Sequence, residues 1–372
     1  MSVIDRVCAD VGERHGELEV LVADAVRRFA PLSTAAERRR LHRDAVARME
    51  GLSELDRLVG DPTIDEVLVN GSEIWIDRRG ELVRAGTLTA TSVEQVIERI
   101  LAPIGRRVDR TSPIVDARLP GGARVCAVVP PVAVSGPTLS IRRFADDARS
   151  IGEFTDPVGV AICRDVIAAG ANVVVCGATS SGKTSLLAAL LDEVDDSERI
   201  IVLEDTSELP CRAPHLVRME ARPASAEGVE AIPLEHLVRT ALRLRPDRIV
   251  VGEVRGDEVL ALCQAMNTGH DGSFSTCHAN GPLDALLRLE SLVLQAAPQW
   301  PLVAVRRQLA RSIDVVVHVA RRGAERRIES ISEVVEPTDD QPPRLRILAS
   351  THDDDHLVAA GALARRRRGG AR

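Results

Sequence analysis

Lysine, aromatic residues and long apolar runs are scarce in this chain of 372 residues. Aromatics make up 2% of the sequence and tyrosine is absent, which argues against stacking platforms for single-stranded nucleic acid. The formal net charge of -7 also argues against a protein that coats nucleic acid. No apolar run approaches the roughly 18–20 residues of a membrane span, and acidic residues interrupt the first twenty positions, unlike a signal peptide. We therefore expect a cytoplasmic protein that does not bind nucleic acid directly.

The cysteines indicate a reducing compartment. Their number is odd and none is spaced as CxxC, so neither a disulfide framework nor a zinc site is expected. They are Cys8, Cys126, Cys163, Cys176, Cys211, Cys263 and Cys277.

Lysine occurs once among the 48 basic residues, at Lys183, and the other 47 are arginine. A guanidinium is a wide planar fork, whereas an ammonium is a compact point charge that fits inside a ring of backbone amides. Lys183 stands at the lysine position of the pattern GxxxxGKT. Its retention there indicates that the group binds phosphate.

The spacing of apolar residues changes along the chain and divides it into four segments that differ in predicted secondary structure. In the first segment Thr34 is expected to cap a helix, with Glu37 completing a capping box. In the second, Asn70-Gly71 is typical of a tight hairpin turn. The predicted segments are 1–58, helical; 59–148, a small α+β domain; 149–350, an α/β domain with C-terminal helices; and 351–372, a tail that we expect to be disordered.

The third segment alternates apolar strands with helices, which is typical of an α/β fold with a mostly parallel sheet. The predicted strands are 172–176, 199–204 and 248–251, and the predicted helices are 160–169, 183–194, 234–243 and 258–266. Further helices are expected within 283–320, followed by a β-hairpin over 326–349.

A phosphate-binding loop is predicted where an apolar strand passes into a helix, in the segment GATSSGKT. Glycines let successive N–H groups turn toward one phosphate, and the helix N-terminus adds positive potential. Lys183 would bind the β- and γ-phosphates of ATP, and the Thr184 hydroxyl would bind Mg²⁺. The alternative is a coincidental Gly/Ser turn. The expected nucleotide-binding residues are Gly177, Ala178, Thr179, Ser180, Ser181, Gly182, Lys183, Thr184 and Ser185.

Two predicted strands end in carboxylates, Glu204 and Glu253. The carboxyl ends of parallel strands line the ligand crevice, so both are expected near the γ-phosphate. Gly252 stands where a Walker B strand usually ends in aspartate. We expect Glu253 to orient and deprotonate the attacking water, and Glu204 to hold a water of the Mg²⁺ shell. The alternative is that either carboxylate caps a helix or pairs with Arg212 or Arg255.

A loop rich in glycine and polar residues, 267–280, carries His270 and His278. No third or fourth ligand is spaced to complete a metal site with them. We interpret the loop as a γ-phosphate sensor, whose imidazoles hydrogen-bond differently to ATP and to ADP. A structural role is the alternative for either histidine.

Four boxes in this order resemble the secretion ATPases of bacterial type II and type IV machines. They are GATSSGKT, RIIVLEDTSEL (199–209), PDRIVVGEVRG (246–256) and MNTGHDGSFSTCHAN (266–280). The sequences of the last two boxes are most similar to those of the CpaF/TadA branch, which powers tight-adherence (Flp-type) pilus assembly. The absence of a paired CxxC insertion favours the same shorter, VirB11-like branch. Through DEVLVNG, SPIVDARLPGGARV and SIRRF the resemblance also reaches the preceding domain.

The resemblance implies a RecA-like P-loop motor domain joined to an N-terminal sensor domain. It implies a homohexamer at the cytoplasmic face of the inner membrane, working with the platform proteins of a pilus or secretion machine. Nucleotide would lie between the two domains, so that arginines complete the site and open the cleft when the γ-phosphate is lost. The arginines expected from the N-terminal domain are Arg118 and Arg124 first, then Arg142 and Arg143. Arg255, in the third box, is also expected to bind the nucleotide.

The favoured function is therefore an ATP-hydrolysing motor. A DNA-handling ATPase of the RecA or helicase type would need a positive channel and stacking aromatics. A nucleotide-gated scaffold would bind ATP with little turnover. The presence of Glu204, Glu253 and His278 argues against the scaffold.

Overall fold

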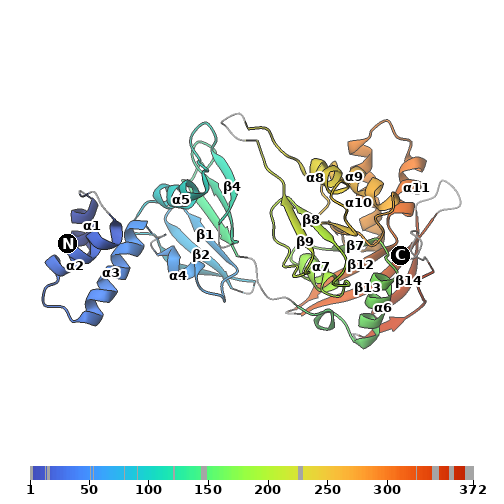
Figure 1. The fold of residues 1–372 in the computed structure, drawn as a ribbon, viewed down its shortest axis with the longest axis horizontal. Helices are drawn as coiled ribbons and strands as arrows, with labels where there is room; N and C mark the ends of the chain where they lie inside the picture. The colour runs from blue at the N-terminus through green and yellow to red at the C-terminus, as the bar shows by residue number, and fades with distance from the viewer. Residues whose placement is uncertain are drawn as a thin grey trace. The chain divides into compact units, whose positions relative to one another are not determined.

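A computed structural model of the chain describes residues 3–12, 14, 17–50, 52, 54–78, 80–89, 91–119, 122–143, 149–224, 229–323, 325–336, 343–351 and 356–364. Contacts divide the chain into two compact units, Met1–Ala145 and Asp146–Arg372 (Figure 1). The predicted helical and α+β segments thus fall within one unit, although each has an apolar core of its own.

The N-terminal unit begins with three helices around a small core that includes Val22 and Ala25. The capping box predicted before the third helix is present. Glu37 Oε2 accepts from the Thr34 backbone N–H at 2.7 Å, and Thr34 Oγ1 accepts from the Glu37 N–H at 3.2 Å. The helices are α1 (Val3–Gly12), α2 (Leu18–Phe29) and α3 (Ala35–Glu50).

An antiparallel six-stranded sheet forms the rest of this unit, in the order β3-β2-β1-β6-β5-β4. Alternate residues such as Val67 and Val69 are buried against α5, and Gly71, with a φ of 58°, turns the predicted hairpin between β1 and β2. The elements are α4 (Leu55–Val59), β1 (Glu66–Asn70), β2 (Glu73–Arg78), β3 (Glu81–Thr87), α5 (Val93–Leu101), η1 (Ala102–Ile104), β4 (Ile114–Arg118), β5 (Arg124–Val128) and β6 (Thr138–Arg142).

The C-terminal unit is built on a nine-stranded sheet in the order β15-β14-β13-β12-β7-β11-β10-β8-β9. The strands from β12 to β9 are parallel, and β13, β14 and β15 extend the sheet antiparallel. The strands are β7 (Val173–Gly177), β8 (Ile200–Glu204), β9 (Leu216–Glu220), β10 (Arg248–Val251), β11 (Phe274–His278), β12 (Val315–Arg322), β13 (Glu325–Val335), β14 (Arg344–Thr351) and β15 (Leu357–Ala359).

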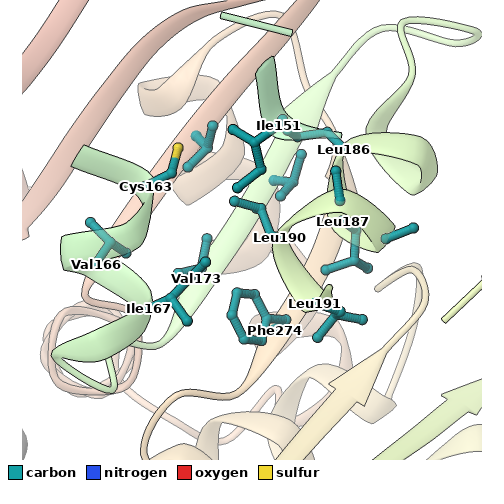
Figure 2. Close-up of a cluster of buried hydrophobic side chains, with 14 of the residues drawn as sticks. Ile151, Cys163, Val166, Ile167, Val173, Leu186, Leu187, Leu190, Leu191 and Phe274 are labelled. Atoms are coloured by element: carbon teal, nitrogen blue, oxygen red, sulfur yellow. The ribbon is translucent and has the colours of Figure 1, made fainter. Parts of the chain in front are cut away.

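Helices cover both faces of this sheet, because the central strands are apolar on both sides. Val173 and Val175 face α6 and α7, whereas Val174 and Cys176 face α8 to α11. Figure 2 shows the first cluster, in which side chains of α6 and α7 gather with Phe274 of β11. The elements are η2 (Ile151–Glu153), α6 (Pro157–Ala168), α7 (Lys183–Leu191), α8 (Leu234–Ala241), α9 (Glu258–Asn267), α10 (Pro282–Ala296) and α11 (Leu302–Ser312).

Two details of the C-terminal region differ from the sequence-based expectation. Helices were expected to reach residue 320, but α11 ends at Ser312 and Val315–Arg322 is strand β12, inserted between β7 and β13. Part of the expected tail is also ordered, since Leu357–Ala359 pairs with β14. Residues 352–355 and 365–372 of that tail lie outside the described residues.

The predicted hairpin over 326–349 is confirmed as β13 and β14. Among the helices described, none is long and apolar enough to cross a membrane.

Candidate functional site

The predicted phosphate loop lies between the end of β7 at Gly177 and the start of α7 at Lys183. A Cβ atom at position 177 would lie 2.3 Å from the Val319 carbonyl oxygen, so only glycine fits against β12 there. Ser180 and Gly182 have φ values of 60° and 97°, in the left-handed region that a tight loop requires. Strand, loop and helix therefore occur in the order that phosphate binding needs.

The ammonium group of Lys183 meets three acceptors. Nζ donates to the carbonyl oxygens of Gly177 at 3.1 Å and Ala178 at 2.9 Å, and lies 3.1 Å from His278 Nδ1. An ammonium has three N–H donors, so these contacts use its full capacity. The sole lysine is thus held inside the loop by the loop's own backbone. Burial lowers its pKa, although the charge of Glu253 acts in the opposite direction.

A chain of contacts links Lys183 to Glu253 through His278. The order of strands explains it, because β11 lies between β7 and β10 and ends in His278. His278 Nε2 lies 3.1 Å from Glu253 Oε1, and Arg255 Nη2 donates to Glu253 Oε2 at 2.5 Å. The predicted pairing of Glu253 with Arg255 is therefore real, but it occupies one oxygen and leaves the other facing the histidine.

Glu253 Oε1 is buried and accepts no well-aligned hydrogen bond from the described residues. The separation from His278 is that of an ion pair, but the ring N–H is not directed along it. Buried carboxylate oxygens are normally satisfied, and exceptions occur where a reactant binds. This oxygen is suited to accept a proton from a bound water.

The histidine between these charges is held neutral. Burial lowers the pKa of His278 below its usual 6.5, and the nearby charges of Lys183 and Arg255 lower it further, while Glu253 opposes them. A neutral imidazole carries one proton, and the lysine contact requires Nδ1 to accept. The proton must then be on Nε2, the nitrogen that faces Glu253.

Glu204 lies against Gly252, the position where a Walker B strand usually ends in aspartate. A Cβ atom at position 252 would lie 2.7 Å from Glu204 Cγ, so the glycine there gives the glutamate its room. Glu204 Oε1 accepts the N–H groups of Glu208 at 3.0 Å and Leu209 at 2.9 Å. Burial raises the pKa of Glu204, whereas these hydrogen bonds lower it. A carboxylate at the end of β8 thus lies beside Gly252, which carries none.

The residues present fit Mg²⁺ bound together with phosphates rather than a metal held by protein alone. No group of three or more His, Cys, Asp or Glu side chains within the described ranges could hold a metal ion. Mg²⁺ usually keeps several waters and takes one or two protein oxygens besides the substrate's phosphates. Thr184, half-buried at the start of α7, and the carboxylate of Glu204 are oxygen donors of the required kind.

His270 is the one predicted site residue of this unit that the structure places elsewhere. It precedes β11, whereas His278 ends it, and a strand advances about 3.3 Å per residue. Because β11 runs parallel to β7, His270 lies at the edge where β7 begins, opposite the phosphate loop. The expectation that His270 binds nucleotide within this unit is therefore corrected.

The first half of the fourth box, MNTGHDGSFSTCHAN (266–280), instead belongs to a buried polar network at that opposite edge. Asn172 Oδ1 accepts the Ser273 N–H at 3.0 Å, and the Asn172 N–H donates to Asp314 Oδ2 at 2.9 Å. These bonds join the starts of β7, β11 and β12. The polar character of the segment is thus explained by packing between strands, which sequence spacing cannot distinguish from ligand binding.

The remaining predicted loop residues are in place for backbone contacts. Ala178, Thr179 and Ser180 are exposed, as a loop open to a ligand should be. Ser181 is buried, and its Oγ makes no hydrogen bond with the described residues. Ser185, half-buried on the first turn of α7, meets an arginine that the sequence did not single out, Arg326 of β13, at 3.4 Å.

Three of the predicted arginines form a row in the N-terminal unit. Arg118 pairs with Arg124 across β4 and β5, and Arg124 pairs with Arg142 across β5 and β6. Directly opposed residues of neighbouring strands share one face. Arg143 differs, since its guanidinium donates to the Asp61 carbonyl oxygen. A role in nucleotide binding stays a prediction both for Arg143 and for the row.

The sequence profile of the type II/IV secretion system proteins matches residues 48–347, which is most of the chain. The chain belongs to this family. As a member of this family the chain is an ATPase of a secretion or pilus motor, and the strand, loop and helix around Lys183 agree with that assignment. The predicted recognition and the α/β fold class are confirmed at this level.

Two relatives illustrate how far the similarity extends. A putative conjugal transfer protein of Mycobacterium tuberculosis is 40% identical over 289 residues, covering 74% of this chain and 82% of the relative. The type IV secretion system protein PtlH of Bordetella pertussis is 32% identical over 305 residues, covering 72% and 89%. This secretion-family chain also shares its fold with the pilus retraction motor PilT solved with ADP, with a TM-score of 0.54, 17% identity and 83% of each chain covered.

Proposed function

We propose that this secretion-family ATPase hydrolyses ATP at the loop of Lys183, with Glu253 as the base that activates water. The observation that supports this proposal is the continuous contact chain from Lys183 Nζ through His278 to Glu253 Oε1. It joins the group suited to the terminal phosphates to the group suited to the water. Nothing in a mere scaffold requires both ends of such a chain.

Each residue then has a distinct role. Lys183 exchanges its contacts with the Gly177 and Ala178 carbonyls for the β- and γ-phosphates, where its charge offsets the charge that develops in the transition state. Glu253 takes the proton of the attacking water on Oε1. His278, placed between them, changes partners when the terminal phosphate leaves. Arg255 holds the second oxygen of Glu253 and so fixes the orientation of its carboxylate.

Mg²⁺ is the proposed cofactor. When bound, it would neutralise part of the charge of the nucleotide's phosphates. On the protein side the Thr184 hydroxyl and Glu204 are the proposed oxygen donors, Glu204 through a water. The fixed position of Glu204 against Gly252 supports its role, because nothing else in the described part of β10 offers a carboxylate at that place.

The proposed partners follow from the family and its named relatives. The Mycobacterium relative is described as a conjugal transfer protein and the Bordetella relative as a type IV secretion protein. We infer that the chain works as a homohexamer at the cytoplasmic face of the inner membrane, against platform proteins of such a machine. The wording of the last two boxes favours Flp-type pilus assembly. Arg118, Arg124 and Arg142 are the proposed arginines that complete the site from the N-terminal unit.

Hydrolysis by the purified full-length chain tests the proposal. ATPase activity should fall to background in a Lys183→Ala variant. A wild-type rate no higher than that of the variant would leave a nucleotide-gated scaffold as the function. A rate strongly raised by added DNA would favour a DNA-handling ATPase instead.

A further inference from the structure

Arg326 lies directly on the phosphate loop. A Cβ atom at Gly182 would be 2.6 Å from Arg326 Cδ and 3.4 Å from its Nε, so the aliphatic stem of the arginine covers the last glycine of the loop. Its Nη1 lies 3.4 Å from Ser185 Oγ, on the first turn of α7. Arg326 is half-buried in this position. A guanidinium is therefore held where the loop passes into its helix.

The strand order places Arg326 on the side of the loop away from the carboxylates. Glu253 follows β10 and His278 ends β11, on one side of β7, whereas Arg326 comes from β13, beyond β12 on the other side. Because β12 is parallel to β7 and Arg326 pairs with Arg321 near its end, the arginine lies at the same edge of the sheet as the loop.

This arrangement gives the bound nucleotide a direction. The γ-phosphate must face Glu253 and the water, so the rest of the nucleotide extends away from β10 and β11. Loop N–H groups hold the α- and β-phosphates, while the lysine reaches the β- and γ-phosphates. We therefore expect the residues that follow Thr184 to lie beside the α-phosphate, and Ser185 is the one that Arg326 meets.

We propose that Arg326 is a nucleotide-binding residue whose guanidinium contacts the α-phosphate of ATP and ADP. The inference rests on the proposed function, since it concerns the same loop. Guanidinium–phosphate contacts are charge-assisted and geometrically specific. The contact remains when the γ-phosphate is lost, so Arg326 contributes to the affinity for ADP as well as for ATP, and not to the hydrolytic step.

The neighbouring arginines of the same hairpin have other partners. Arg322 donates to both oxygens of Glu329 at 2.8 Å, and Arg327 pairs with Glu325 within the strand. Arg327→Gln therefore removes the same charge one residue from Arg326 without touching the loop. It is the matched control.

Calorimetric binding of ADP and steady-state hydrolysis of ATP and GTP by the full-length chain test the inference. In Arg326→Gln the Kd for ADP and the KM for both triphosphates should rise roughly tenfold or more, as expected for the loss of one charged hydrogen bond. The kcat should stay within about twofold, because binding common to ground and transition states acts on KM. Equal effects on ATP and GTP are expected, since both share the α-phosphate.

Three results would overturn it. A folded Arg326→Gln protein with unchanged ADP affinity, a fall in kcat at constant KM, or an equal loss in Arg327→Gln each contradicts a contact with the α-phosphate. Arg326→Lys provides a second variant that keeps the charge, and its ADP affinity should lie nearer to wild type than that of Arg326→Gln. A wild-type chain that bound neither ATP nor ADP would overturn the proposed function instead, which the calorimetric control reveals separately.

Discussion

Lys183 Nζ lies 3.1 Å from His278 Nδ1, at the junction of the phosphate loop with the strand beside it. An ammonium can only donate, so this contact makes Nδ1 the acceptor and assigns the ring proton to Nε2. Lys183 thus determines that the ring nitrogen nearest Glu253 is the one that carries the proton. The contact exists only while the ring is neutral.

The first prediction concerns pH. Burial holds the pKa of His278 below its usual 6.5, so the ring is neutral near pH 7 and gains a proton only in more acid solution. Protonated Nδ1 cannot accept from Lys183, and kcat/KM for ATP should decline as the pH falls below 6.5. In the unfolded chain the ring binds its proton more readily, so the free energy of unfolding declines in the same direction. This decline is the acidic limb of the pH profile of ATP hydrolysis, and that profile measures it.

A His278→Asn variant should lose that acidic limb while keeping a lower, flatter rate. His236→Asn, which replaces a histidine of α8 remote in sequence from the site, is the control and should keep the wild-type profile. An acidic limb that persists in His278→Asn would assign the titration to another group and contradict the role of the contact.

The second prediction concerns Glu253. In Glu253→Gln the side chain keeps its shape but cannot take a proton from water, so kcat should fall by roughly a hundredfold or more. ATP affinity should change little, because proton transfer from water to Glu253 is needed for the reaction and not for ATP binding. Asp257→Asn, an exposed carboxylate four residues further on, should hydrolyse ATP as wild type does. Loss of ATP affinity in Glu253→Gln would instead indicate that the carboxylate organises the loop.

Local patterns were enough to predict the frame of this site. The alternation of apolar strands and helices, the glycines of the loop and the carboxylates after two strands are signals within a few residues of one another. They predicted the strand, loop and helix around Lys183 and the approach of Glu253 and His278. The contact between Glu253 and His278 also requires β11 to lie between β7 and β10. That order is set by pairing between strands far apart in the sequence.

The features that sequence reasoning missed depend on distant pairing. The apolar run after Ser312 suits a buried helix or a buried strand equally, and β7, about 140 residues earlier, makes it a strand. His270 and His278 share one box, but a strand between them carries them to opposite edges of the sheet. Arg326 is one of 47 arginines, and only the register of β12 with β13 brings it to the loop.

The third prediction concerns the sole lysine. Three acceptors surround Nζ at 2.9–3.1 Å, which suits three N–H donors on one nitrogen. On ATP binding this compact group turns from the two carbonyls to the β- and γ-phosphates. A guanidinium spreads its donors over a wide plane and does not fit inside the same ring of backbone amides. Lys183→Arg should therefore lose ATP binding by roughly a hundredfold although the charge is kept, as calorimetry would measure. Affinity within a few-fold of wild type would show that charge alone suffices at this position.

The last prediction concerns the room that Gly252 gives to Glu204. In Gly252→Ala the new Cβ would lie 2.7 Å from Glu204 Cγ, closer than carbon atoms pack, so the glutamate must move from its bonds with Glu208 and Leu209. Forced overpacking of this kind costs about 1–3 kcal/mol in the free energy of unfolding. The Mg²⁺ concentration that half-saturates hydrolysis should rise as well, because the displaced carboxylate is the proposed metal partner. Urea unfolding and a Mg²⁺ titration of ATPase activity measure the two effects.

Gly152→Ala is the matched control for this substitution. A Cβ atom at position 152 meets only Ser150 Oγ, at the ordinary distance of 3.8 Å, so stability should change by less than about 0.5 kcal/mol. If Gly252→Ala lost stability but required no more Mg²⁺ than wild type, Glu204 would be a structural residue. If Gly252→Ala changed neither the stability nor the Mg²⁺ requirement, Glu204 would have another position to adopt. Its place beside β10 would then not explain why position 252 lacks an aspartate.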